Sequence, residues 1–180
     1  TLCLVGGTFD CFHTGHQALL EAALDCDSVE VWVTSDAIAA EKDPRVKPLT
    51  ERHQSILDWA DGRSISTHTL EDTWGPAPTR AEATHIVCTP ETQSNCDKIN
   101  QMRIEGNLEP LNIIVVNHVL AHDGEPISSS KIRQGSIDRE GKSWILEKDL
   151  EHSVHMPTNL DAELKEPMGT LFPGPEDTPE

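Results

Sequence analysis

The chain has 180 residues, 36% of them hydrophobic, and its 31 Asp and Glu against 14 Lys and Arg give a formal net charge of -17. This length suits one domain with a short appendage, and so acidic a chain lacks the basic surface that binding to nucleic acid or to a membrane surface requires. Five cysteines without a CxxC pair or a repeated spacing favour reduced thiols over disulfides or a zinc site. With no apolar run of about 18 residues and no signal-peptide pattern, we expect a cytoplasmic protein.

The predicted elements alternate between strands and helices. Apolar runs predict five strands, at residues 2–5, 29–34, 64–70, 85–88 and 111–116. Helices are expected from Thr14 or Gly15 to about Asp25, from a Thr50 cap to Ala60, and from residues 89–92 to Gly106. Ser35 caps a short helical turn, and residues 42–48 form an exposed loop. This alternation predicts an α/β fold, with a parallel five-stranded sheet and helices on both faces.

The chain changes character after about Leu150. Residues 156–180 contain five of the twelve prolines and many acidic residues, with little periodicity. We therefore expect a domain over residues 1–150 and an acidic, proline-rich C-terminal tail over residues 151–180, with one short helix and a disordered end.

The first candidate motif is GGTFDCFHTGH at residues 6–16, between the first predicted strand and the helix that follows it. Ligands of parallel sheets bind at the carboxyl ends of the strands, and a glycine turn that opens a helix offers backbone N–H groups to an anion. His13 and His16 are spaced to reach the same phosphate. A metal pair, or a histidine that bonds to the backbone, is the alternative, and glycine turns also close ordinary strand–helix units.

The second candidate motif is SSSKIR at residues 128–133. One serine would suffice as a helix cap, whereas three serines followed by Lys131 and Arg133 suit a polyphosphate. Six of the fourteen Lys and Arg residues fall within residues 42–52 and 128–133. In so acidic a chain, this clustering favours an anionic ligand.

The two motifs together resemble the signatures of the HxGH nucleotidyltransferase superfamily. Segments between them make the chain similar to the archaeal-type phosphopantetheine adenylyltransferases, namely residues 34–36, 74–76, 90–92, 98–103 and 120–127. The resemblance covers residues 2–141 and implies a Rossmann-like nucleotidyltransferase fold. It also implies that AMP passes from ATP to phosphopantetheine, giving dephospho-coenzyme A and pyrophosphate. The alternatives are an FAD synthetase, a cytidylyltransferase, or a nucleotide-binding protein without activity.

The resemblance also implies roles for individual residues. The implied catalytic residues are His13, His16, Lys42 and Arg133, with His16 stabilising the charge that develops on the α-phosphate. The implied ATP-binding residues are Gly7, Thr8, Phe9, His13, Gly15, His16, Arg103, Ser128, Ser129, Ser130 and Lys131. The implied acceptor-binding residues are Thr8, Asp10, Lys42, Lys47 and Arg52. Lys42, Lys47 and Arg52 are alternatives for the cation that bridges the two substrates, and a solvated helix charge is the alternative for Arg103.

The remaining expectations concern cofactors and partners. Mg²⁺ would arrive with ATP, and no protein metal site is expected. Residues 156–171 resemble the opening segment of archaeal GTP-dependent dephospho-coenzyme A kinases, which suggests a link to a kinase domain of the coenzyme A pathway. Too few residues follow for a kinase domain, so we expect no kinase activity, and a chance match within an acidic tail is the alternative. A monomer is favoured.

Overall fold

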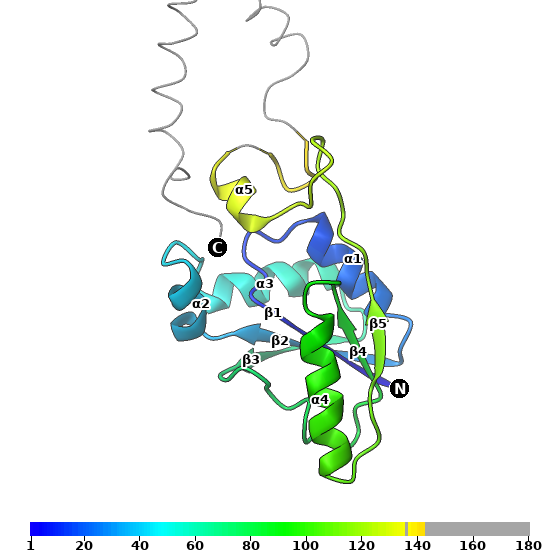
Figure 1. Cartoon of the computed structure of the whole chain (residues 1–180). Helices are drawn as coiled ribbons and strands as arrows, with labels where there is room; N and C mark the ends of the chain where they lie inside the picture. The colour runs from blue at the N-terminus through cyan, green and yellow to red at the C-terminus, as the bar shows by residue number, and fades with distance from the viewer. Residues whose placement is uncertain (136, 143–180) are drawn as a thin grey trace, which may run out of the picture. The chain divides into compact units, whose positions relative to one another are not determined.

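A parallel five-stranded sheet organises the first part of the chain in the computed structural model, which describes residues 1–135 and 137–142 (Figure 1). Its strands are β1 (Leu2–Gly7), β2 (Ser28–Thr34), β3 (Ile65–Leu70), β4 (His85–Cys88) and β5 (Asn112–Val115). They lie in the order β3-β2-β1-β4-β5, and every neighbouring pair is parallel. The predicted fold is therefore confirmed. Since the chain leaves β1 toward β2 and β3 and later returns to its other side, the topological switch point lies between β1 and β4.

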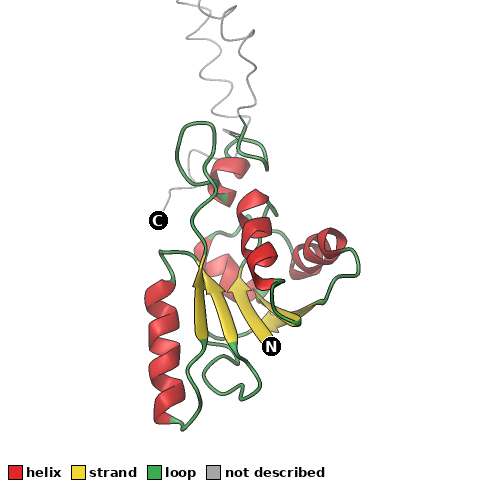
Figure 2. Ribbon diagram, turned by 90° about the vertical axis from the view of Figure 1, so that its right-hand side faces the viewer, coloured by secondary structure: helices red, strands yellow, loops and turns green. Residues whose placement is uncertain are grey.

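Helices cover both faces of this sheet (Figure 2). Helices α1 (Thr14–Ala23) and α3 (Leu49–Ala60) pack on one face, where Leu20 and Ile56 meet the valines of β2. Helix α4 (Gln93–Glu105) packs on the other face through Cys96 and Ile99. Helix α2 (Asp36–Lys42) follows β2 directly, and the Ser35 hydroxyl caps it as expected. Alternate residues of β1 enter the two cores, because successive side chains of a strand point to opposite faces.

A second compact unit begins at Val119. Its described part contains an antiparallel bridge between Leu120 and Pro126, the short helix α5 (Ser129–Arg133), and an apolar cluster of its own around Ile127 and Ile137. Gly141 has a φ of 82°, and a Cβ there would lie 2.9 Å from the Ala121 Cα, so this position requires glycine.

Two predicted helix boundaries need correction. Thr50 does not cap α3: the N-cap is Pro48, which makes no side-chain cap hydrogen bond. The Leu49 N–H donates instead to the Asp36 carboxylate at 2.8 Å, so another segment satisfies this end of the helix. Helix α1 ends at Ala23, before the expected Asp25. The predicted boundary at residue 150, the tail helix, the disordered end and the kinase-like segment lie outside the described residues.

None of the helices in the described part of the chain has the length and apolar content needed to cross a membrane.

Candidate active site

The turn after β1 has a strained backbone. Phe9 and Cys11 have φ angles of 55° and 49°, in the left-handed region that side-chain-bearing residues rarely adopt. The buried Phe9 ring folds back over Gly7, where an added Cβ would lie 3.0 Å from it. Each such conformation costs on the order of 1–3 kcal/mol and persists only where surrounding contacts maintain it, as they often do at functional sites.

His13 and His16 cap helix α1 with their own rings. His13 is the N-cap, and its Nδ1 accepts the Gly15 N–H at 3.0 Å. The His16 Nδ1 accepts the His13 N–H at 3.2 Å, which completes a capping box. Because both Nδ1 atoms are acceptors, each neutral ring carries its proton on Nε2. The backbone role and the ligand-binding role of these histidines can therefore coexist on different ring nitrogens.

Both rings are neutral near pH 7. They stack with centroids 3.7 Å apart, and the Phe9 and Phe12 rings lie 5.1 and 5.7 Å from the His16 ring. Burial lowers the pKa of His13 to about 4. Burial, with a smaller contribution from the charge of His13, lowers the pKa of His16 well below its ordinary value of 6.5. The pair therefore offers N–H dipoles to a ligand and not two full charges.

The His13 ring leaves no space for a side chain at Gly15. A Cβ at Gly15 would lie 2.8 Å from the His13 Cε1 and 2.9 Å from its Nδ1. Any larger residue would therefore push the ring away from the N–H that it accepts.

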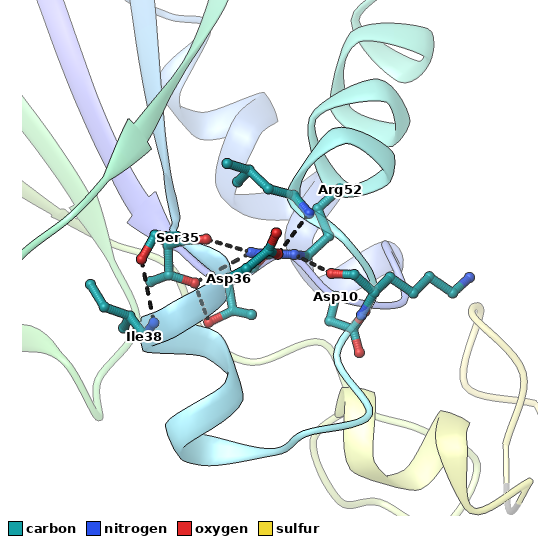
Figure 3. A network of polar contacts seen from close by, with 9 residues as sticks. Asp10, Ser35, Asp36, Ile38 and Arg52 are labelled. Carbon is teal, nitrogen blue, oxygen red and sulfur yellow. Dashed lines mark hydrogen bonds and ion pairs between the residues drawn. The ribbon is translucent and has the colours of Figure 1, made fainter.

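Asp10 and Arg52 connect the turn to the loop that follows α2 (Figure 3). Asp10 is buried and accepts the Lys47 N–H at 3.1 Å, and Arg52, only 1% exposed, donates to the Lys47 and Thr8 carbonyls at 2.7 and 3.1 Å. The structure contradicts the expectation that these side chains bind the acceptor, because both are buried and bind the protein's own backbone. Thr8 lies beside them, with its hydroxyl 3.0 Å from that of Thr34.

Arg103 is also an internal residue. It is 1% exposed and donates to the carbonyls of Glu109, Ala77, Arg80 and Ala83, in the segments that precede β5 and β4. These carbonyls lie toward the amino ends of the strands, whereas ligands bind at the carboxyl ends. The expectation that Arg103 faces the nucleotide is therefore wrong, and so is its alternative of a solvated charge.

A cavity of about 260 Å³ opens on the α4 face of the sheet and shares Gly7 with the turn. We call it the Trp32–Trp74 cavity, after two of its walls. The Trp32 ring is held in place: its Nε1 donates to Glu30 at 3.2 Å, and the His68 ring stacks on it 4.8 Å away. The cavity's polar lining comes from Lys42, Thr73, Thr92 and Asn95.

The three candidate bridging cations occupy different environments. Lys42 lines the Trp32–Trp74 cavity. Lys47 is exposed, and its backbone N–H is bound to Asp10. Arg52 is buried. The geometry therefore favours Lys42 for contact with a ligand in the cavity.

The second motif forms the N-cap and the whole of α5. Ser128 is its N-cap and accepts the Lys131 N–H at 3.2 Å. The Lys131 ammonium pairs with Asp123 at 3.1 Å, so its charge is partly neutralised, and the Arg133 guanidinium lies 3.5 Å from the Ser130 hydroxyl. Ser128, Ser130, Lys131 and Arg133 thus gather with Ser129 on one short helix. A joint triphosphate site with the first motif stays a prediction.

Comparison with known proteins identifies the family. A family model described as cytidylyltransferase-like matches residues 4–135, which is more than half of the chain.

The chain belongs to the cytidylyltransferase-like family.

Two archaeal relatives narrow the relationship. The phosphopantetheine adenylyltransferase of Methanothermobacter thermautotrophicus is 37% identical over 144 residues, covering 78% of this chain and 88% of the relative. That of Methanopyrus kandleri is 38% identical over 141 residues, covering 75% and 89%. An Archaeoglobus fulgidus crystal structure, described as a protein of unknown function, matches with a TM-score of 0.60 and 26% identity, over 64% of this chain and 89% of that one. The family inferred from the two motifs is confirmed.

Sequence reasoning missed three residues that shape this site. Trp32 and Trp74 line the cavity, and Thr34 contacts Thr8. Thr34 and Trp74 lie within segments that carried the resemblance, but the sequence contained no sign that they meet the turn or the cavity. Trp32 belongs to a predicted strand, and neither the period nor the composition of that strand distinguishes a cavity wall from a core residue.

Proposed function

We propose that this chain is a phosphopantetheine adenylyltransferase, which transfers AMP from ATP to 4′-phosphopantetheine and releases dephospho-coenzyme A and pyrophosphate. The observation that carries the proposal is the continuity of the histidine-capped turn with the Trp32–Trp74 cavity through Gly7. Such a site suits a ligand with a phosphate at one end and an uncharged arm at the other. The two archaeal relatives of the same name, of which this chain covers 88% and 89%, support it.

The proposed reaction is a direct displacement at the ATP α-phosphorus. An oxygen of the acceptor phosphate forms a bond to that phosphorus as the bond to the β-phosphate oxygen breaks, and pyrophosphate leaves. No covalent enzyme intermediate is required, so the protein's task is to position the reactants and stabilise charge. The Nε2–H groups of His13 and His16, the Thr8 hydroxyl and the Lys42 ammonium are the proposed donors to phosphate oxygens. Ser128, Ser129, Ser130 and Arg133 are the proposed ligands of the β- and γ-phosphates.

Magnesium enters this proposal as part of the nucleotide substrate. Within residues 1–135 and 137–142, no three His, Cys, Asp or Glu side chains gather as metal ligands. We propose that Mg²⁺ binds triphosphate oxygens, where it neutralises part of their charge. All five cysteines are buried thiols outside any disulfide, which supports work in a reducing compartment such as the cytoplasm. The monomeric state and the link to a kinase domain stay predictions.

An assay of pyrophosphate release tests the proposal directly. The purified chain is supplied with ATP, Mg²⁺ and 4′-phosphopantetheine, and mass spectrometry identifies the second product. We expect pyrophosphate and dephospho-coenzyme A in equal amounts. Release only with CTP, or only with FMN as the acceptor, would assign the chain to another nucleotidyltransferase activity, and binding of ATP without any release would make it a nucleotide-binding protein.

A further inference from the structure

A chain of hydrogen bonds runs from Arg52 through Thr34 to Thr8. The Arg52 Nη1 lies 2.7 Å from the Thr34 carbonyl oxygen and 3.4 Å from the Thr34 hydroxyl. The Thr34 hydroxyl in turn lies 3.0 Å from the Thr8 hydroxyl. The chain therefore joins the end of β2 to the turn in which we place phosphate binding.

The guanidinium sets the direction of these bonds. Arginine has five N–H donors and no acceptor, so the Thr34 hydroxyl oxygen is the acceptor in its 3.4 Å contact with the Arg52 Nη1, which also donates to the Thr34 and Thr8 carbonyls. The Thr34 hydrogen is then free to donate to Thr8, and the Thr8 oxygen accepts it. Because the Thr34 hydroxyl is the donor in this bond, the Thr8 hydroxyl hydrogen can donate to another partner. Thr8 is only partly buried, so a bound phosphate oxygen can be that partner.

Arg52 is held firmly enough to impose this direction. Its Nε donates to the Lys47 carbonyl at 2.7 Å, and its Nη2 donates to Asp36 at 3.0 Å (Figure 3). The Asp36 side chain is 66% exposed, so this ion pair contributes little by itself. Backbone carbonyls from three segments supply the other strong contacts, and they hold the guanidinium plane in one orientation.

We propose that Arg52 and Thr34 are positioning residues that turn the Thr8 hydroxyl into an oriented hydrogen-bond donor for a substrate phosphate. This inference rests on the proposed function, which places a phosphate at the turn. It separates two roles among neighbouring residues: Thr8 contacts the substrate, whereas Thr34 and Arg52 act only through Thr8.

A double-mutant cycle tests the proposal. Thr8→Val, Thr34→Val and the double variant are compared with the wild-type chain for kcat, for the KM of each substrate, and for Tm. We expect Thr34→Val to lower kcat/KM about 3- to 10-fold, as for the loss of one net hydrogen bond. We expect the double variant to be no worse than Thr8→Val alone, because Thr34 has nothing left to orient. Thr34→Ser keeps the hydroxyl and should restore wild-type turnover.

Thr67→Val is the matched control for the loss of a strand hydroxyl. Thr67 lies on β3, and its hydroxyl is 3.3 Å from the His53 Nδ1, away from Thr8. We expect its Tm to change about as much as that of Thr34→Val, without a loss of kcat/KM. Additive losses for Thr8→Val and Thr34→Val, or equal losses for Thr34→Ser and Thr34→Val, would overturn the proposal in favour of a merely structural Thr34.

The same cycle remains informative if the wild-type chain shows no adenylyl transfer, an outcome that would refute the proposed function by itself. The four proteins are then compared by calorimetry for their affinity for ATP and, separately, for 4′-phosphopantetheine. If Thr34→Val lowers the affinity for either ligand in the wild-type background but not in the Thr8→Val background, the positioning role of Thr34 is supported. Unchanged affinity for both ligands overturns it.

Discussion

The rings of His13 and His16 stack 3.7 Å apart, and each uses its Nδ1 to accept a backbone N–H at the start of α1. The contacts that begin the helix are thus the same contacts that orient the two Nε2–H groups. A proton added to either Nδ1 would remove a helix cap, and protonation of both rings would bring two positive charges together. The structure therefore couples the charge state of the pair to its geometry.

Two substitutions of His16 test the roles of its two ring nitrogens separately. In His16→Asn, the side-chain Oδ1 can still accept the His13 N–H, but no donor reaches the position of the His16 Nε2–H. In His16→Gln, the longer side-chain amide can place an N–H at that position. We expect His16→Asn to lower kcat by roughly 10²–10³ with little change in Tm, as for the loss of one transition-state donor. His16→Gln should lower kcat by a smaller factor. Pyrophosphate-release kinetics and thermal melts measure both, and wild-type turnover of His16→Asn would remove His16 from the proposed mechanism.

The lowered pKa values of the pair predict that acid destabilises the fold. Between the unfolded pKa of 6.5 and the folded pKa of about 4 for His13, the unfolded chain binds more protons than the folded one. The stabilisation is therefore complete above about pH 6.5 and is lost as the pH falls toward 4, by about 3 kcal/mol at most for His13. Urea unfolding at several pH values measures this loss. His16→Asn should show a shallower dependence than wild type, and identical curves would contradict the burial effect on His16.

Gly15→Ala tests the contact between Gly15 and the His13 ring. Alanine normally favours a helix over glycine by up to about 1 kcal/mol. Here the new Cβ would lie 2.8 Å from the ring, so we expect no gain in Tm and a loss of kcat of at least about tenfold. Gly106→Ala is the control, because a Cβ there would meet its nearest backbone oxygens at an ordinary 3.5 Å. If Gly15→Ala kept full activity, the His13 ring would not need its present position.

Arg103→Met should impair stability and leave catalysis intact. Four backbone carbonyls would lose a buried donor, so we expect the free energy of unfolding to fall by about 2–4 kcal/mol. The KM for ATP should not change at temperatures at which the variant is folded. Denaturant unfolding and steady-state kinetics measure the two quantities. A raised KM with unchanged stability would instead return Arg103 to the nucleotide site.

The fold could be predicted from the sequence because buried parallel strands leave a strong local signal. Runs such as residues 2–5 and 85–88 are continuous and apolar, and the segments between them have helical periodicity or turn residues. The observed strands agree with those runs to within about two residues. The N-terminal contact of α3 could not be predicted from the local sequence. A Thr50 cap was expected there, but the carboxylate of Asp36, from another segment, accepts the Leu49 N–H.

The arginines show why part of the site could not be predicted. In so acidic a chain, we expected Arg52 and Arg103 to serve an anionic ligand. A guanidinium can equally be satisfied by backbone carbonyls, and those that bind Arg103 come from segments as distant as Ala77. No local pattern reveals such a partner. The backbone role of His13 and His16 was easier to predict, since it follows from the start of one helix, whereas their ligand-binding role stays a prediction.

All five thiols are buried, so their reaction with a thiol reagent would show when the folded structure opens. Burial raises the pKa of Cys3 and of Cys96 to about 12, so almost no thiolate exists in the closed state near neutral pH. A thiol-reactive dye would therefore label these two sites only when the structure opens. Cys96 lines the Trp32–Trp74 cavity and Cys3 lies in the opposite core, so labelling at each would time the opening of a different face of the sheet.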